Sequence, residues 1–438
     1  MRENAFAENA AMAGEVTVTG SRRRWLRRGL CVLSNTFQRC LLPLTFVALC
    51  HGTAQASETT KTVRIGVLSD FSSVYSTSGG SGLLAGVKLA IEDFNKENPH
   101  SGLKIEVVSA DHQNKADIGG TIARQWFDRD NVDVVMDVTN SAVAFTVSNI
   151  ARRANKVVIF SGAGSARLTG DLCSPNTVHW TYDTYEVGNA MGRAITQSGG
   201  KSWFFINADY AFGQELRKYA EAAVTRFGGT VVGGVSVPSN NPDFSSYLLQ
   251  AQGSGAKVVA FALGGNDLVT AIKQAQEFGM SGQQTFAALN ANIVDVRGIG
   301  LDVAQGILVA EPFYWDMNPV TRAWTKRFIA INPASYPTLH HAAMYAATLH
   351  YLRAVAALGD PADGRAVVAK MEQVPTHDGL FSDGMIRKDG RTIHDIYLFR
   401  VKSPSESKGP WDYYKLVSTI PGKDAFRPLN EGECPLVK

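Results

Sequence analysis

The fold is decided by two neighbouring stretches, VRIGVL at residues 63–68 and GLLAGVKLAIEDFNK at residues 82–96. The first is a short apolar run typical of a β-strand. In the second, apolar residues recur at helical spacing and form one stripe: Leu84, Val87, Ile91 and Phe94. A strand followed by an amphipathic helix indicates a parallel sheet, because parallel strands need a long crossover connection. We therefore predict a β-strand over 63–68 and an α-helix over 82–96.

The same alternation continues and then restarts. Strand patterns follow at 103–108, 132–138 and 157–160, and helical patterns lie between them at 118–129 and 142–153. From residue 202 there are strand patterns at 202–206, 230–235, 257–263, 284–289 and 307–310, and helical patterns at 212–227, 244–252 and 267–278. Strands separated by 10–15-residue helical stretches predict βαβ units. We expect two α/β lobes of similar plan, joined near residues 181 and 312.

The last part of the chain has a different pattern. Helical patterns at 321–331, 340–358 and 365–373 precede two β runs at 396–401 and 411–417. We interpret this part as material that completes the two earlier sheets. The predicted fold class is α/β, with two doubly wound parallel-sheet lobes joined by a multi-strand hinge. The N-terminal lobe is expected at 57–180 with 313–390, and the C-terminal lobe at 181–312 with 391–438. Lobes joined in this way can close around a ligand.

The first 56 residues have the pattern of a secretory signal peptide. They contain Arg-rich sequence (SRRRWLRRG from Ser21), an apolar run over 40–50 and the small-residue motif Ala54-Gln55-Ala56. The apolar run is shorter than the ~20 residues that span a bilayer. We predict cleavage after Ala56 and export to the periplasm, by the general or the twin-arginine route.

The net charge of the chain argues against nucleic-acid partners. The whole chain carries +3, and residues 1–56 hold seven Arg and three Glu, so the rest carries −1. A near-neutral body has no basic surface that would indicate nucleic-acid binding. We expect no nucleic-acid partner.

Only two of the five cysteines, Cys173 and Cys434, lie beyond the leader. In an oxidising compartment they are a candidate disulfide, and two unpaired thiols are the alternative. Neither has a C-x-x-C neighbour, so we assign no metal site.

Ligands of open α/β sheets bind outside the carboxyl ends of the strands. The loop at 161–167 (SGAGSAR) is rich in small residues, so backbone N–H groups and the Ser161 and Ser165 hydroxyls can hold polar oxygens; an ordinary tight turn is the alternative. Tyr210 and Phe212 lie on a strand-to-helix loop, where aromatic rings suit ligand contact or packing against their own helix.

Catalytic motifs give little support for an enzyme. Residues 80–85 (GSGLLA) fit a dinucleotide fingerprint, with Asp111 downstream, but about ten residues separate them from the preceding strand. We find no metalloprotease, P-loop or nucleophile-elbow motif. His340, His341 and His350 do not have i, i+4 spacing, so we interpret them as helix-face residues, one of which can face the cleft. We expect no enzyme activity, cofactor or metal.

Seven stretches together resemble a known family: 65–75 (IGVLSDFSSVY), 161–170 (SGAGSARLTG), 172–185 (LCSPNTVHWTYDTY), 207–213 (NADYAFG), 244–252 (FSSYLLQAQ), 311–319 (EPFYWDMNP) and 408–416 (KGPWDYYKL). The chain resembles the type I periplasmic substrate-binding proteins of ABC importers, in the leucine/isoleucine/valine-binding branch. The similarity covers essentially the whole mature chain. The subgroup is associated with aromatic carboxylates as well as amino acids.

The resemblance implies a ligand site with contacts in both lobes. Carried over position by position, it places these contacts at Tyr75 and Ser78, at Asn140 and Ser141, at Gly162, Ala163, Gly164 and Ser165, at Asp183, at Tyr210 and Phe212, and at Asn266 and Asn290. From the residues alone, Asn140 and Ser141 at a helix start are equally explained by N-capping.

Two positions depart from the amino-acid binders. Asn290 stands where an acidic residue pairs with the ligand ammonium, and Asn266 stands where a tyrosine is usual. An amide cannot neutralise a buried ammonium, and an unpaired buried charge is unfavourable. We therefore expect an aromatic or other small organic acid, with a hydrophobic amino acid as the alternative. The resemblance implies an ABC permease and its ATPase subunits as partners of a monomeric receptor. A periplasmic sensor with a signalling partner, or a secreted hydrolase, is the alternative.

Overall fold

The computed structural model describes residues 61–437. The first lobe contains a sheet of five parallel strands in the order β2-β1-β3-β4-β5. These strands are β1 (Lys61–Ser69), β2 (Leu103–Asp111), β3 (Val134–Asp137), β4 (Val157–Phe160) and β5 (Thr177–His179). Strands β3 and β4 are buried at every position. Continuous apolar runs of this kind are required in a parallel sheet that helices cover on both faces.

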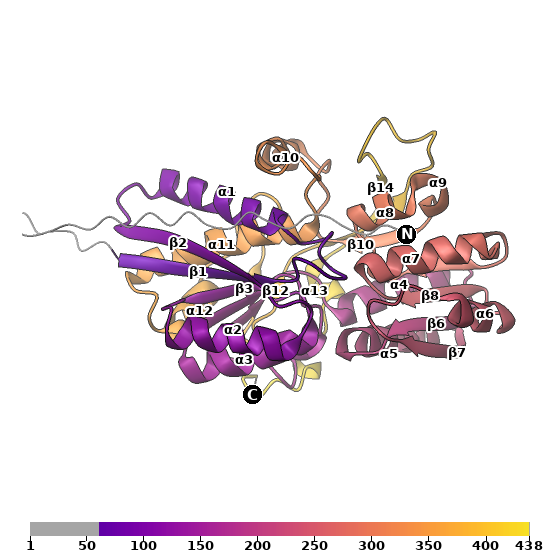
Figure 1. Cartoon of the computed structure of the whole chain (residues 1–438), viewed down its shortest axis with the longest axis horizontal. Helices are drawn as coiled ribbons and strands as arrows, with labels where there is room; N and C mark the ends of the chain where they lie inside the picture. Colours follow the sequence, from indigo (N-terminus) through magenta and orange to yellow (C-terminus); the bar gives the residue numbers. More distant parts are fainter. Residues whose placement is uncertain (1–60, 438) are drawn as a thin grey trace, which may run out of the picture. The chain divides into compact units, whose positions relative to one another are not determined.

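Successive side chains of a strand point to opposite faces, and each face has its own helices. Val135 and Val158 pack with α2 (Ala116–Asp128) and α3 (Ser141–Ala154). Met136 and Ile159 pack with α1 (Gly82–Glu97) and α11 (Leu339–Leu358). Figure 1 shows α1 above the strands of this sheet and α2 and α3 below them. The remaining helices of this part are α10 (Pro319–Ile331), which contacts α1, and α12 (Gly364–Gln373), which contacts α11.

The second lobe repeats the plan with four parallel strands in the order β7-β6-β8-β9. They are β6 (Ser202–Ala208), β7 (Thr230–Val237), β8 (Val258–Ala262) and β9 (Thr285–Ala288). Trp203 and Phe205 belong to the apolar cluster of α4 (Thr184–Gln197) and α5 (Ala211–Arg226). Phe204 and Ile206, on the other face, pack with α6 (Ser245–Gly253), α7 (Gly265–Glu277) and α8 (Ile293–Ile299).

A third, antiparallel sheet consists of β10 (Leu308–Glu311), β13 (Ile396–Val401) and β14 (Tyr414–Ile420). Two short strands, β11 (Met385–Ile386) and β12 (Thr392–Ile393), form a hairpin, and α9 (Leu301–Ala304) and α13 (Gly422–Ala425) are single turns. The chain passes between the lobes after β5, after β10 and after β12, and its end returns to the first lobe after β14. The prediction of two parallel-sheet lobes joined by a multi-strand hinge is confirmed, and the residue limits proposed for the lobes stay a prediction.

The predicted elements are found, but strands β5, β11 and β12 and helices α4, α8, α9 and α13 were not predicted. The interpretation that the last part of the chain completes the two earlier sheets is wrong for its β runs, because β13 and β14 pair with β10 in a separate sheet. Gly188 and Gly192 argue against a helix at α4, because glycine disfavours helices. In the structure a Cβ at Gly188 would lie 2.8 Å from the Ala220 nitrogen, and one at Gly192 would lie 2.9 Å from the Ala223 Cβ. Both glycines therefore allow α4 and α5 to pack closely.

The strand predicted at 411–417 begins three residues later. Trp411 has a left-handed backbone (φ 70°) and lies before β14, which spans Tyr414–Ile420. A residue with positive φ does not continue an extended strand, so the pairing with β13 starts after the turn.

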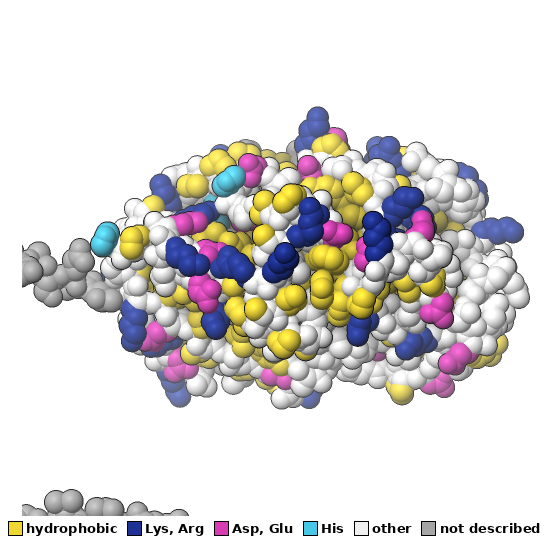
Figure 2. All heavy atoms as spheres, turned by 90° about the horizontal axis from the view of Figure 1, so that it is seen from above, with side chains coloured by type: hydrophobic (Ala, Val, Ile, Leu, Met, Phe, Trp, Pro, Cys, Tyr) yellow, Lys and Arg dark blue, Asp and Glu magenta, His cyan; other side chains and the backbone are white. Residues whose placement is uncertain are grey.

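The face seen in Figure 2 has hydrophobic side chains gathered in its middle, and acidic and basic side chains interspersed around them. Within residues 61–437, no helix combines the length and apolar character needed to cross a bilayer. The predicted signal peptide and its cleavage site lie outside the described residues.

Candidate ligand-binding site

The loops at the carboxyl ends of the two parallel sheets contact each other directly. The Asn266 backbone N–H, at the start of α7, donates to the Val74 carbonyl at 3.0 Å. The Tyr75 and Tyr210 hydroxyls form a hydrogen bond between the lobes. A Cβ at Gly164 would lie 3.0 Å from the Phe212 ring, so this glycine permits a close approach of the second lobe. Predicted site residues from both lobes are thus brought together.

The loop after β1 is folded back by a buried carboxylate. Asp70, which is 0% exposed, accepts hydrogen bonds from the Ser73 N–H (2.8 Å) and the Tyr75 N–H (3.0 Å). This turn directs Tyr75 to the second lobe. Burial, with the neighbouring Tyr210, raises the pKa of Tyr75, so the phenol stays neutral. Ser78 lies inside the first lobe, where its hydroxyl is 3.3 Å from the Tyr75 carbonyl and its own carbonyl accepts from Thr338.

A second buried carboxylate, Asp137, lies beneath the loop after β4. It accepts hydrogen bonds from the Ser69 hydroxyl (2.6 Å) and the Ser161 hydroxyl (2.9 Å), and so joins three strand ends. A Cβ at Gly162 would lie 2.7 Å from Asp137 Oδ1, so only glycine fits over this carboxylate. His340 Nδ1 lies 2.9 Å from the Ser161 carbonyl. The histidine on α11 therefore supports the loop from the side of the helix.

Ser165 is held in a network with Glu215 and Thr184. Its Oγ lies 2.7 Å from both carboxylate oxygens of Glu215, on the second lobe, and accepts from the Arg167 N–H at 3.2 Å. Thr184 Oγ1 donates to Glu215 Oε2 at 3.2 Å and accepts from the Ala166 N–H at 3.1 Å. Burial raises the pKa of Glu215, and the two hydroxyl donors act against that rise. The Ser165 hydroxyl thus connects the lobes.

Four aromatic rings meet at the same interface: Tyr75, Tyr182, Tyr210 and Phe212. The Tyr210 and Phe212 ring centroids are 6.1 Å apart. Tyr182, which follows β5, donates its hydroxyl to the Gly162 carbonyl at 3.1 Å, and a Cβ at Gly164 would lie 2.8 Å from its ring. Burial raises the pKa of Tyr182. A Cβ at Gly264 would lie 3.1 Å from the Tyr75 ring and 3.2 Å from the Asn290 amide nitrogen. Asn290 therefore faces the aromatic cluster from the second lobe.

Four predicted site residues lie at the starts of helices: Asn140, Ser141, Asp183 and Asn266. Asn140 caps α3, accepting from the Ala142 N–H at 2.8 Å, and Ser141 is buried at the first position of that helix. Asp183 caps α4 and lies 3.6 Å from Arg391. The Asn266 side chain is exposed, and its backbone makes the contact with Val74. The ligand roles of these four residues stay predictions.

Several residues at this interface were missed in the sequence analysis: Asp70, Asp137, Tyr182 and Glu215. The two aspartates end or follow strands, a position that could have drawn attention. Glu215 has no local signal, because it lies in the fifth position of α5 and meets Ser165 only through the fold.

Cys173 and Cys434 form a disulfide with a Cα–Cα distance of 5.6 Å, so this prediction is confirmed. Gly82, in the apparent dinucleotide fingerprint, begins α1, and a Cβ there would lie 2.4 Å from His341 Nε2. Helix packing therefore accounts for this glycine. Within residues 61–437, no group of three or more His, Cys, Asp and Glu is arranged to hold a metal ion.

The known proteins that match this chain are periplasmic binding proteins. A family model described as "Periplasmic binding protein" matches residues 62–410. Among solved structures, a periplasmic binding protein from Burkholderia mallei is 43% identical, with a TM-score of 0.83, and the match covers 86% of this chain and 100% of that one. A branched chain amino acid ABC transporter periplasmic ligand-binding protein from Burkholderia xenovorans is 38% identical, with a TM-score of 0.76 and the same coverage of both chains.

More distant relatives share the fold. A solute binding protein from R. palustris in complex with 4-hydroxybenzoate is 18% identical, with a TM-score of 0.75, and the match covers 84% of this chain and 99% of that one. The Leu/Ile/Val-binding protein homolog 6 of Brucella melitensis is 25% identical over 51% of this chain, and the chain spans only 57% of that relative's length. These relatives are named as binding proteins.

Proposed function

The chain belongs to the periplasmic binding protein family, and we propose that it is the solute receptor of an ABC importer, capturing a small organic acid for a membrane permease and its ATPase subunits. An aromatic carboxylate is the favoured ligand, and a hydrophobic amino acid is the alternative. The observation that carries this proposal is the meeting of strand-end loops from both lobes around four aromatic rings. A flat ligand held there would touch both lobes at once, which favours closure.

The proposed ligand has an anionic end and a ring. The backbone N–H groups of residues 163–165 and nearby hydroxyls would hold the carboxylate, as polar donors in an enclosed site do. The ring would lie against Tyr75, Tyr210 and Phe212, since offset or edge-on aromatic contacts stabilise such complexes. Asn290 supports a ligand without an ammonium group, because an amide offers no charge to pair with one.

The receptor is proposed to work in the periplasm as a monomer. The Arg-rich leader, its apolar run and the motif ending at Ala56 support export with cleavage at that point. The disulfide between Cys173 and Cys434 is in keeping with an oxidising compartment. A sensor that signals to a membrane partner would use the same closure, and genetic removal of the permease would separate the two roles.

Calorimetry tests the ligand class. The mature chain is titrated with benzoate, 4-hydroxybenzoate and L-leucine, and we expect heat from an aromatic acid. Phe212→Ala should weaken that binding at least tenfold, because it removes a ring from the interface. Tyr247→Ala, on α6 away from the interface, is the matched control and should bind normally. Tight binding of leucine with no response to either aromatic acid would refute the proposed ligand class.

A further inference from the structure

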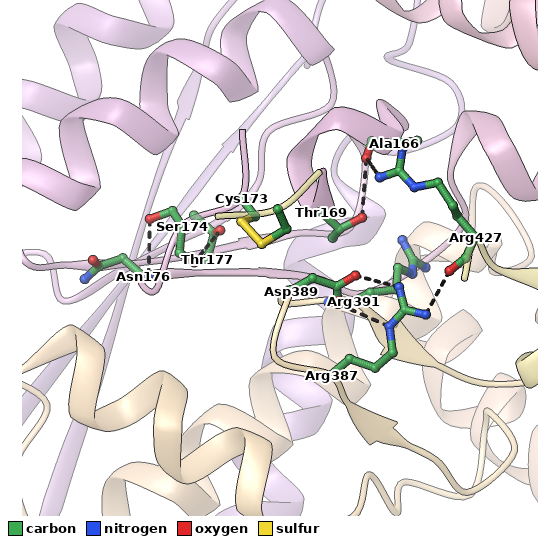
Figure 3. The surroundings of a disulfide bond; sticks show 11 residues. Ala166, Thr169, Cys173, Ser174, Asn176, Thr177, Arg387, Asp389, Arg391 and Arg427 are labelled. Atoms are coloured by element: carbon green, nitrogen blue, oxygen red, sulfur yellow. Dashed lines mark hydrogen bonds and ion pairs between the residues drawn. A yellow bond between two sulfur atoms is a disulfide. The ribbon is translucent and has the colours of Figure 1, made fainter. Parts of the chain in front are cut away.

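The end of the chain returns to the first lobe. Residues 421–437, which we name the C-terminal strap, follow β14 of the antiparallel sheet. At its far end Cys434 is joined to Cys173, in the segment between β4 and β5 (Figure 3). Pro435 lines a small pocket together with Phe145 and Arg152 of α3, and Figure 1 shows the C-terminus beside that helix. The strap is thus a further connection to the first lobe, closed by a covalent bond.

Arg427 of the strap binds both lobes at once. Its Nη2 donates to the Ala166 carbonyl at 2.9 Å, in the first lobe. Its Nη1 donates to the Tyr219 hydroxyl at 3.2 Å, on α5 of the second lobe. The half-buried guanidinium has a planar set of donors, which suits two acceptors in different directions. A single side chain therefore bridges the two halves of the molecule.

Several close contacts hold the C-terminal strap in place. The Arg427 carbonyl accepts from Arg387 Nη1 at 2.9 Å, and Arg387 itself pairs with Asp389 at 2.6 Å (Figure 3). The Arg391 guanidinium carbon lies 4.1 Å from the centre of the Phe426 ring. A Cβ at Gly170 would lie 2.8 Å from the Gly432 carbonyl oxygen, so glycine allows the strap backbone to approach the first lobe closely. These contacts hold the backbone of Arg427 while its side chain reaches outward.

The acceptor of Arg427 lies beside the proposed ligand loop. Ala166 directly follows Ser165 and begins a 3₁₀ helix over Ala166–Thr169. Ser165 contacts Glu215 on α5, the same helix that carries Tyr219. Arg427 thus fixes, from outside, the distance between the loop at 162–166 and α5.

From this geometry we propose that the C-terminal strap is a positioning element for ligand capture, with Arg427 as its positioning residue. It holds the loop at 162–166 against α5 and so stabilises the closed arrangement of the lobes. Arg427 does not touch the ligand. The inference rests on the proposed function, because the loop that it positions is the one proposed to hold the carboxylate.

The test combines hydrogen exchange with binding kinetics. Arg427→Ala should speed amide exchange over residues 162–170, whose N–H groups at Leu168 and Gly170 bond within that loop. It should also raise the 4-hydroxybenzoate dissociation rate about tenfold and leave the association rate unchanged, as expected when a charged hydrogen bond of the closed state is lost. Arg427→Lys should recover part of the affinity. Replacing Cys173 and Cys434 together by Ser should act in the same direction as Arg427→Ala.

Two matched variants separate positioning from general stability. Tyr219→Phe removes only the acceptor in the second lobe, so it should raise the dissociation rate roughly threefold without changing exchange at 162–170. Arg322→Ala removes an exposed arginine paired with Asp316 and should change neither measurement. Unchanged exchange and unchanged dissociation in both Arg427→Ala and the double Ser variant would overturn the proposal. If the wild type binds neither 4-hydroxybenzoate nor L-leucine, the proposed function fails, and the exchange of residues 162–170 alone decides the role of the strap.

Discussion

Glu215 is the residue whose surroundings bear most directly on ligand charge. It receives the Ser165 hydroxyl that the family resemblance assigns to the ligand carboxylate. A donated O–H serves one strong acceptor at a time, so the carboxylate of Glu215 and that of a ligand would compete for it. Like charges that are close and partly buried also repel each other.

Glu215→Gln is therefore expected to strengthen binding of an aromatic carboxylate. We expect roughly a fivefold decrease of the Kd, or about 1 kcal/mol, because a like charge next to the anion is removed. Calorimetry with 4-hydroxybenzoate measures it. Glu221→Gln, on the same helix and paired with Arg217, is the control and should have no effect. Weaker binding by Glu215→Gln alone would instead make the carboxylate a requirement for the ligand.

Asp295 makes stability depend on pH. Burial raises the pKa of this carboxyl to about 7, well above its unfolded value. Between about pH 4 and pH 7 the folded chain therefore binds more protons than the unfolded chain, so its free energy of unfolding falls as pH rises through that window. The decrease is at most about 1.4 kcal/mol per pH unit for one group.

Urea unfolding at several pH values tests this. Asp295→Asn keeps a side-chain oxygen that can accept the Asn292 N–H, and it should make the slope between pH 4 and pH 7 less steep. Burial also raises the pKa of Glu186, Glu311 and Asp378, so part of the slope remains. Asp302→Asn, at an exposed position, should leave it unchanged. An identical slope in Asp295→Asn and the wild type would contradict the assignment.

At the scale of elements, the α4–α5 contact shows how packing overrides propensity. An isolated α4 would gain about 1 kcal/mol from alanine in place of glycine. In the folded protein, however, Gly192 lies against α5 with no room for a methyl group. This contact supports the second lobe beneath the loop that carries Tyr210 and Phe212.

Gly192→Ala should therefore lower the free energy of unfolding by about 1–3 kcal/mol, the usual effect of overpacking. Urea unfolding provides the measurement. Gly253→Ala is the matched control, because it lies at the end of α6 with open space around it and should be neutral or slightly stabilising. Equal stability of Gly192→Ala and the wild type would mean that α4 can move away from α5 without loss.

At the scale of the whole molecule, the disulfide joins positions 261 residues apart in the sequence. Such a cross-link restricts the unfolded chain, so replacing Cys173 and Cys434 by Ser should reduce the free energy of unfolding by about 3–5 kcal/mol. Urea unfolding of the double variant measures this effect. Wild-type protein unfolded with a reductant present should reproduce the reduced value, and an unchanged midpoint in both would contradict the prediction.

Much of the fold could be read from local patterns. The strands at 157–160 and 396–401 have the predicted bounds, and helix α1 ends one residue later than predicted. Such elements are predictable because burial on one or both faces imposes a repeat of apolar residues on the local sequence. The family could also be recognised from seven short stretches, and the match over 62–410 confirms it. The ligand roles of individual residues stay predictions.

No local sequence pattern predicted the contacts between residues that are distant in the sequence. The hydrogen bond between Tyr75 and Tyr210 joins residues that are 135 positions apart in the sequence, and the one between Ser165 and Glu215 joins residues that are 50 positions apart. No local repeat encodes which side chains face each other when two sheets approach. Helical and strand periods arise from neighbours along the chain, whereas the interface between the lobes arises from the geometry of their packing. The elements and the family therefore follow from residue order, while the contacts of Glu215 and Arg427 between the lobes exist only in the assembled structure.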